Sequence, residues 1–248
     1  REMRFNMGEC RNDLGGYFII DGKEKTVVPQ ETFGDNMLRV NKVDSDSVLC
    51  TAEIKSVSEN TSKPVRTLSV DLVAPSGRYS NMNIVVNIPN VRKPVPLFIV
   101  FRALGIVTDK HIVEMCLLES LNSSNNANGA NSLLQDLFIP SVHDAGPVMT
   151  QAAAIHFIAH LTKTKTNTNA LHILTDYFLP HIGETNYIEK AYFLGHMVKQ
   201  LIMVYQGMEL PIDRDSFRYK RVELVGTLMY KLFREYYKMQ MKHIHVSF

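Results

Sequence analysis

The stretch Leu97-Phe98-Ile99-Val100-Phe101-Arg102-Ala103-Leu104-Gly105 divides the sequence into two parts of different character. Its first five residues form an apolar run that follows Pro94 and Pro96, and we expect a buried strand at Leu97–Phe101. Before this stretch the apolar runs are short and separated by turns, and after Gly105 they have helical spacing. Strands followed by helices predict an α+β fold with a strand-rich N-terminal third.

The N-terminal third contains a hairpin signal. Tyr17–Ile20 and Glu24–Val28 flank Asp21-Gly22, a dipeptide that tolerates the positive φ values of a tight reverse turn. Further strands are predicted in three short apolar runs, Val48–Ile54, Thr67–Val73 and Ile84–Ile88.

Four helices are expected after Gly105. The carboxylate of Asp109 can accept hydrogen bonds from the unpaired amides of a first turn, so Asp109 is a suitable N-cap. Proline at a helix start needs no amide donor, and Gly146-Pro147 is therefore expected to open the second helix. The expected helices span His111–Leu118, 147–161, Tyr187–Tyr205 and Val222–Met241. The polar runs Asn122–Asn131 and Lys163–Asn169 are predicted to be exposed loops.

Composition bounds the class of protein. The 248 residues are 45% hydrophobic and 21% charged, which is typical of one large or two modest globular domains. A net charge of +2 does not by itself indicate a nucleic-acid-binding protein. The charge is uneven, however, because the segment 214–242 has eight basic and three acidic side chains, a net +5. The basic residues are Arg214, Arg218, Lys220, Arg221, Lys231, Arg234, Lys238 and Lys242. They are either phosphate contacts or a solvated basic face.

The cysteines and the chain start bear on location. Cys10, Cys50 and Cys116 are too few and too widely spaced for a disulfide framework, so reduced thiols of an intracellular protein are expected. The sequence has no signal peptide and no apolar run of about 18 residues that would span a bilayer. It begins Arg1-Glu2-Met3, and we expect it to be a segment of a longer protein.

No metal site is expected from the nine histidines. His156 and His160 have the i, i+4 spacing of a zinc-protease helix, but the glutamate of that motif is absent. They are interpreted as packed or surface histidines. His243 and His245 are interpreted as part of a frayed C-terminal tail.

Catalytic motifs are also missing from the sequence. It contains no GxSxG nucleophile motif, and Gly15-Gly16 lacks the spacing and the lysine of a phosphate-binding loop. The acid pairs Asp44/Asp46 and Asp213/Asp215 lie in polar turns, where solvated carboxylates are far more common than cation ligands. An independent hydrolase or metalloenzyme is therefore disfavoured.

Four blocks of sequence resemble signatures of one family, the second-largest subunit of multisubunit DNA-directed RNA polymerases of eukaryotic, archaeal and viral type. They occur in the family's order over about residues 9–236. Ser216 stands where the family usually has His, and Arg218 where it usually has Gly. The blocks are GGYFIIDGKEK at Gly15–Lys25 with Gln30-Glu31, FRALGI at Phe101–Ile106 with Asp109, FLPH at Phe178–His181 with KAYFLGHM at Lys190–Met197, and DRDSF at Asp213–Phe217 with KRVELVG at Lys220–Gly226.

The resemblance implies a domain division. Residues 1–30 would end a first protrusion segment, 31–221 would form a helical lobe domain, and 222–248 would begin the returning protrusion segment. The C-terminal helix is then expected to pack near the N-terminal hairpin.

The resemblance also implies a function. In this family the lobe and protrusion form one wall of the DNA cleft, and the aspartates that bind Mg²⁺ belong mainly to the largest subunit. This chain is therefore expected to be a noncatalytic part of a nucleotidyltransferase, without a cofactor of its own. The alternative is a stand-alone interaction module that docks a polymerase subunit or initiation factor.

Site residues and partners follow from the same resemblance. Lys25 and Gln30, expected on one strand, would border the RNA–DNA hybrid, and Lys220, Arg221 and Arg214 would lie near the template. Arg102 is expected to be a structural arginine bonded to carbonyls or a carboxylate. The implied partners are the largest subunit, a small zinc-ribbon subunit, initiation factors, the DNA template and the RNA–DNA hybrid, with no membrane. The implied location is the nucleus or, for a viral enzyme, the host cytoplasm or virion.

Overall fold

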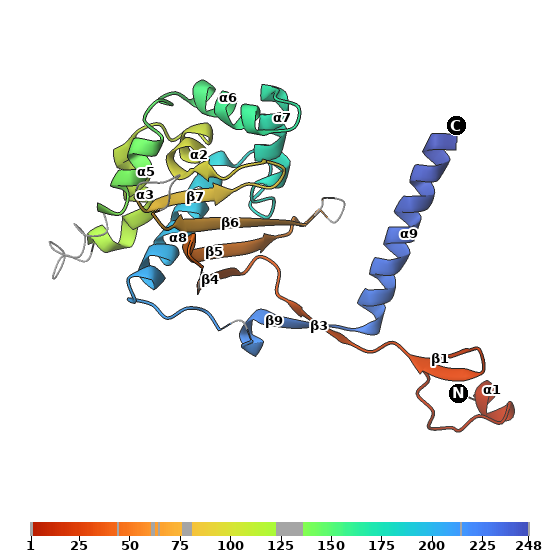
Figure 1. Ribbon diagram of the computed structural model, residues 1–248. Helices are drawn as coiled ribbons and strands as arrows, with labels where there is room; N and C mark the ends of the chain where they lie inside the picture. Colours follow the sequence, from red (N-terminus) through yellow and green to blue (C-terminus); the bar gives the residue numbers. More distant parts are fainter. Residues whose placement is uncertain are drawn as a thin grey trace. The chain divides into compact units, whose positions relative to one another are not determined.

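The computed structural model describes residues 2–43, 45–60, 63, 65–75, 81–122, 136–213 and 215–247. The chain divides into two compact units (Figure 1). Unit 1 comprises Arg1–Gly34 and Asp215–Phe248, and unit 2 comprises Asp35–Arg214. No helix within the described part of the chain is long and apolar enough to cross a bilayer.

Unit 2 contains a five-stranded antiparallel sheet in the order β4-β5-β6-β7-β8. Consecutive strands are neighbours, so the sheet is a simple meander. Burial alternates along β5 and β6, as the two-residue period of a strand with one covered face requires. The strands are β4 (Leu38–Lys42), β5 (Val48–Ser56), β6 (Arg66–Val73), β7 (Asn83–Asn87) and β8 (Val95–Pro96).

Helices cover the buried face of this sheet. The longest, α8 (Tyr187–Tyr205), packs on β4, β5 and β6, while α2 (Leu97–Ala103) packs on β7 and β8 (Figure 1). Within its described residues, unit 2 also has the helical elements α3 (Asp109–Asn122), α5 (Ile139–Asp144), α6 (Gln151–Leu161), α7 (Asn167–His172) and the π-helix η1 (Ile173–Tyr177).

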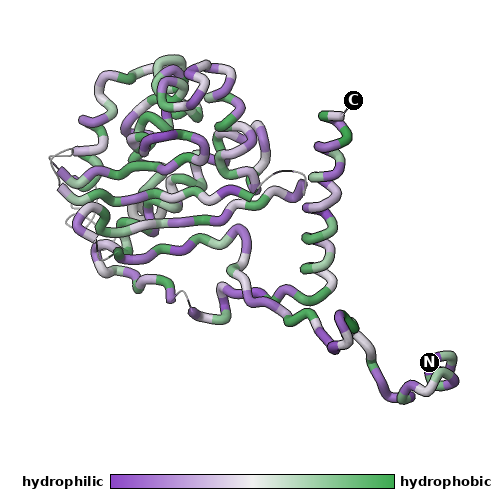
Figure 2. Tube along the Cα trace, turned by 45° about the vertical axis from the view of Figure 1, so that its right-hand side comes forward, coloured by the Kyte–Doolittle hydropathy of each residue, from purple (hydrophilic) through white to green (hydrophobic). Residues whose placement is uncertain are grey.

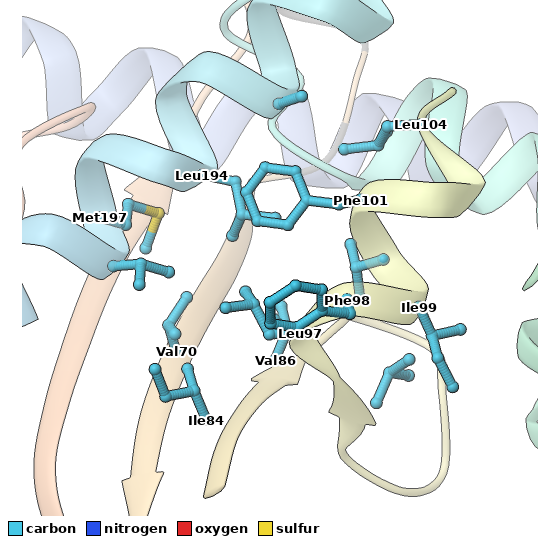
Figure 3. Close-up of a cluster of buried hydrophobic side chains, with 14 of the residues drawn as sticks. Val70, Ile84, Val86, Leu97, Phe98, Ile99, Phe101, Leu104, Leu194 and Met197 are labelled. Atoms are coloured by element: carbon cyan, nitrogen blue, oxygen red, sulfur yellow. The ribbon is translucent and has the colours of Figure 1, made fainter. Parts of the chain in front are cut away.

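The core lies between α2, α8 and the sheet. Figure 3 shows Phe98 and Phe101 of α2 among Leu194 and Met197 of α8 and apolar side chains of the strands. The ring of Phe98 also meets the ring of Phe138 edge to face, with centroids 6.4 Å apart. Each fully buried side chain of this size contributes about 1.5–3 kcal/mol by leaving water.

One glycine permits the close approach of two core helices. A Cβ added at Gly195 of α8 would lie 2.9 Å from the carbonyl oxygen of Met115 in α3. Side chains larger than hydrogen therefore require these helices to separate.

The predicted strand at Leu97–Phe101 is wrong, because these residues form the first turns of α2. Every residue of α2 is buried, so the helix has no polar face and its sequence shows no helical period. A short apolar run of this kind is compatible with a buried strand or a buried helix. Pro96, which caps the helix in an extended conformation, marks its start.

Several helix boundaries also differ from the predictions. Asp109 is the first residue of α3 rather than its N-cap. α6 begins at Gln151 instead of Pro147, because the Thr150 hydroxyl caps it by accepting a hydrogen bond from the Ala153 amide at 3.2 Å. The predicted loop Lys163–Asn169 ends where α7 begins, at Asn167. Residues 123–131 of the predicted Asn-rich loop lie outside the described residues.

The remaining predictions for the fold class are confirmed. The strands at β5, β6 and β7 coincide with the predicted apolar runs, and α8 has the predicted bounds. The chain is strand-rich first and helical afterwards, and it ends in a helix.

Unit 1 consists of two strand pairs and two helices. The hairpin β1 (Tyr17–Ile20) and β2 (Lys23–Thr26) turns at Asp21 and Gly22, whose φ values of 54° and 72° are those of a type I′ turn. The second pair is β3 (Gln30–Phe33) with β9 (Lys220–Glu223). The helices are α1 (Glu2–Asn6) and α9 (Val225–Ser247), and the short 3₁₀ turn η2 (Phe217–Tyr219) precedes β9.

The C-terminal helix α9 differs from its prediction at both ends. Val222 belongs to β9, so the helix starts at Val225. It continues to Ser247, and His243 and His245 are therefore helical rather than frayed. No described side chain of α9 is buried, although polar and apolar residues alternate along it (Figure 2). Its packing near the hairpin stays a prediction.

Candidate nucleic-acid interface

The strand pair β3–β9 brings two distant parts of the sequence together. Its antiparallel register pairs Gln30 with Glu223, Glu31 with Val222, Thr32 with Arg221 and Phe33 with Lys220. The Gly34 amide extends the pairing by donating to the Tyr219 carbonyl at 2.7 Å. We call this two-stranded element the ribbon. It collects three of the five predicted site residues, Gln30, Lys220 and Arg221.

The two basic residues of the ribbon lie on opposite faces. Paired residues of an antiparallel ladder share a face, and consecutive residues of a strand alternate between faces. Lys220 therefore shares one face with Phe33 and Glu31, while Arg221 shares the other with Gln30. A single phosphate backbone running along one face would meet only one of these two cations.

Lys220 is engaged by carboxylates. Its Nζ lies 2.5 Å from Glu31 Oε1 and 3.3 Å from Asp215 Oδ1, and it approaches the ring of Phe33 at 6.0 Å. The side chain is 15% exposed. The hydrogen bond to Glu31 raises the pKa of Lys220, so the ammonium is retained, but two acids already face it.

Arg221 is an exposed residue of the ribbon. Its Nη1 donates to the backbone carbonyls of Lys220 at 2.7 Å and Arg218 at 3.2 Å. The acid on the same face, Glu223, is paired with Lys231 of α9. A positive guanidinium beside a neutralised carboxylate can attract a phosphate.

The hairpin presents Lys25 on a separate strand from Gln30, which corrects the expectation that one strand carries both. Lys25 pairs with Phe18 and shares a face with Lys23, which pairs with Ile20. This face is exposed throughout. It combines two cations with two apolar side chains.

The entry to the hairpin is organised by one carboxylate. Asp13 accepts hydrogen bonds from the Gly15 amide at 2.9 Å and the Tyr17 hydroxyl at 2.8 Å. The hydrogen bond from Gly15 is the main cause of the lowered pKa of Asp13, and the bond to Asp13 raises the pKa of Tyr17 to about 12. The positive φ values of Gly15 and Gly16, 71° and 89°, fit this bend.

The other candidate residues from the sequence show no sign of a catalytic or metal site in the described part of the chain. The rings of His156 and His160 stack with centroids 6.2 Å apart. Within the described residues, no group of three or more His, Cys, Asp or Glu side chains could hold a metal ion. Asp215 forms an ion pair with Lys220. The three cysteines are free thiols. Asp44 and Arg214 lie outside the described residues.

Arg102 is the structural arginine that the sequence predicts. Its side chain is 1% exposed, and its Nη1 donates to the Ala145 carbonyl at 2.8 Å and to the Val148 carbonyl. Its Nη2 pairs with Asp109 at 2.5 Å. The guanidinium thus joins α2 to α3 and to the segment after α5.

Comparison with known proteins identifies the family. The sequence model described as RNA polymerase Rpb2, domain 2, matches residues 61–223. The chain belongs to the family of second-largest RNA polymerase subunits.

Relatives in this family come from eukaryotes and archaea. The chain is 35% identical over 242 residues to DNA-directed RNA polymerase II subunit RPB2 of Encephalitozoon cuniculi. This alignment covers 94% of this chain and 20% of the relative. It is 33% identical over 240 residues to DNA-directed RNA polymerase II subunit 2 of Arabidopsis thaliana (92% and 19%). Subunit Rpo2 of Saccharolobus shibatae is 30% identical over 246 residues (96% and 20%). The chain therefore spans about a fifth of the length of these second-largest subunits.

Sequence reasoning missed one buried cation. Lys190 of α8 is 0% exposed, and its Nζ donates to the carbonyls of Leu174 at 2.8 Å, Thr175 at 2.9 Å and Glu184 at 3.2 Å. Burial lowers the pKa of Lys190 to about 8. The ammonium thereby holds two carbonyls of the π-helix η1, those of Leu174 and Thr175. The available signal was a lysine beside Ala191 on the apolar face of a predicted helix.

Proposed function

We propose that this chain forms the lobe and the flanking protrusion segments of a second-largest polymerase subunit, and that it is a noncatalytic wall of the DNA cleft. The observation that carries the proposal is the ribbon. It unites the family block that contains Gln30 with the block that contains Lys220 and Arg221. Basic and polar side chains suit a processive enzyme, which must hold phosphates without reading sequence.

The proposed domain division is 1–30 and 222–248 for the protrusion segments and 31–221 for the lobe. Two observations support it. The compact units change at Gly34 and Asp215, close to these limits. Among the described residues, unit 1 has no buried apolar side chain, so it lacks a core of its own. Further parts of the subunit would supply the surfaces that cover it.

In this proposal the chain works as part of a DNA-directed nucleotidyltransferase and is inactive alone. Its partners are other polymerase subunits, including the largest subunit and a small zinc-ribbon subunit, together with initiation factors, template DNA and the RNA–DNA hybrid. The chemistry of Mg²⁺ belongs mainly to another subunit. The relatives' assignment to RNA polymerase II supports a nuclear location.

The proposal assigns different roles to the basic residues. The exposed residues Arg221, Gln30 and Lys25 are candidate phosphate or sugar contacts. Lys220 is ion-paired with Glu31 and Asp215. It can contact a phosphate only when one of these two ion pairs breaks. Arg214 would act beside them near the template.

The test uses the assembled polymerase carrying Arg221→Ala. Retention of nucleic acid in elongation complexes should fall equally on different templates, because phosphates are common to all sequences. The slope of log affinity against log salt should decrease by about one unit for each lost phosphate contact. Lys110→Ala, which removes an exposed cation of unit 2, is the control and should leave the slope unchanged. An unchanged slope together with a large drop in Tm would show that Arg221 serves the fold instead.

A further inference from the structure

Unit 2 contains a groove that the proposed function does not use. It has a volume of about 530 Å³ and lies between the loop after β7, the loop after α6, and α7 with η1. Among its lining residues are Arg92 on one side, Lys163 on the other, and Asn90, Asn169 and Tyr177. We call it the basic groove.

The cations of this groove are available to a ligand. Arg92 and Lys163 are exposed, and within the described residues neither side chain has a hydrogen-bond or ion-pair partner. Lys93 and Lys165, one and two residues away in sequence, are also exposed. No lining residue is acidic. Two exposed cations therefore line the groove, and no acidic residue lines it.

The backbone of both sides is fixed in advance. The Arg92 amide donates to the Leu161 carbonyl at 3.1 Å, which ties the first loop to the end of α6. The buried Thr162 hydroxyl donates to the Ala159 carbonyl at 2.7 Å and accepts from the Lys165 amide at 3.2 Å. A ligand would thus meet loops that need little ordering, which lowers the entropic cost of binding.

The third side of the groove is also rigid. His172 pairs with Asp176 at 2.8 Å, and its ring meets that of Tyr177 edge to face with centroids 5.4 Å apart. The guanidinium of Arg66 lies 4.6 Å from the centre of the Tyr177 ring. Asp176 also binds Lys63 at 3.0 Å, so this acid is already engaged.

We propose that the basic groove binds a short acidic segment of a partner protein, with carboxylates on Arg92 and Lys163. The amides of Asn90 and Asn169 can each donate and accept, as a peptide backbone requires. Apolar Val91 and Ile173 and the ring of Tyr177 supply contacts for one apolar side chain. The volume is in the range of pockets that take ligands of small-molecule size, hence only a few residues.

Charge distribution favours a peptide over a nucleic acid at this place. Residues 35–214 include 15 basic and 16 acidic side chains, a formal charge of −1. Nucleic-acid affinity arises from many phosphate contacts along an extended basic surface. A confined cluster of cations on a slightly acidic unit instead fits a ligand of few charges.

The test measures fluorescence anisotropy of the full 248-residue chain with the fluorescein-labelled peptide Gly-Glu-Asp-Leu-Glu-Asp-Gly. A matched peptide has Gln and Asn in place of Glu and Asp. The double variant Arg92→Ala with Lys163→Ala should weaken binding of the acidic peptide by about tenfold, equivalent to about 1.4 kcal/mol. Lys42→Ala with Lys110→Ala removes the same charge from exposed positions of unit 2 outside the groove, and it should change affinity less than about twofold. Should the alanine pair disturb the fold, Arg92→Gln with Lys163→Gln retains polar side chains there.

Three results would overturn the proposal. The first is no binding of the acidic peptide, or equal binding of the Gln/Asn peptide. The second is an equal effect of the two double variants, which would indicate general charge attraction. The third is tighter binding of single-stranded DNA that displaces the peptide and depends on Arg92 and Lys163, which would assign the groove to phosphates. None of these measurements involves the ribbon, so they test the groove separately from the cleft-wall role.

Discussion

Replacing Arg102 with methionine is expected to destabilise unit 2 by about 3–5 kcal/mol, the usual cost of breaking a buried ion pair by removing one partner. Methionine occupies much of the same space but donates no hydrogen bond. The buried carbonyls of Ala145 and Val148 would then lose their shared donor. The loss at Val148 costs about 1–3 kcal/mol. The loss at Ala145 costs less, because its carbonyl also accepts from the Val148 amide at 3.1 Å. The carboxylate of Asp109 is 38% exposed, so water can replace its lost partner at smaller cost.

The assay is urea unfolding of the whole chain, followed by circular dichroism, for wild type, Arg102→Met, Asp109→Asn and the double variant. Asp109→Asn alone should cost about 1 kcal/mol, because Arg102 keeps its two carbonyl acceptors. The double-mutant cycle should give a coupling of about 1 kcal/mol, since the two side chains are in direct contact. A loss below about 1 kcal/mol for Arg102→Met, at an unchanged m-value, would refute the reasoning that these bonds hold α2, α3 and the segment after α5 together.

Three further changes give separate tests. The pKa of Lys190 is lowered from 10.5 to about 8, so between these pH values the unfolded chain holds a proton that the folded chain has released. The free energy of unfolding should therefore rise with pH across this window, and Lys190→Met should remove the rise in pH-dependent urea titrations. Gly195→Ala should cost about 1–3 kcal/mol by forcing α8 from α3, whereas Gly226→Ala, whose Cβ would meet open space in α9, should be neutral or stabilising in thermal unfolding. Glu31→Gln should release Lys220 to phosphate and increase the salt slope of the assembled polymerase by up to about one unit; an unchanged slope would count against Lys220 as a contact.

The sequence predicts an element well where one face is polar. Tyr187–Tyr205 has apolar residues at helical spacing and polar ones between them, and α8 has these bounds. Leu97–Phe101 has no polar face because α2 is enclosed by the sheet and other helices, so its period is hidden. The tertiary environment decides whether Leu97–Phe101 becomes helix or strand, and the local sequence pattern does not contain that information.

The candidate site shows a similar division. The family blocks indicate which residues gather, and the ribbon unites Gln30, Lys220 and Arg221. The blocks do not indicate on which face of the ribbon each side chain lies, because the faces of Lys220 and Arg221 follow from the strand register. Nor do they reveal that Glu31 and Asp215 already engage Lys220. A cluster of cations in sequence thus overstates the charge available to a ligand.

The ribbon has a consequence for how the gene could be rearranged. The chain passes from unit 1 into unit 2 after Gly34 and is back in unit 1 before Tyr219. Gly34 and Tyr219 are hydrogen-bonded to each other. On the other side the Ile212 amide donates to the Val40 carbonyl of β4 at 3.0 Å, so the first strand of unit 2 and its last segment are neighbours as well. Unit 2 is therefore a cassette with adjoining ends. Two residues such as Asn-Gly in place of residues 35–218 would turn β3 and β9 into an ordinary hairpin, and the excised cassette could be grafted into the turn of another host protein.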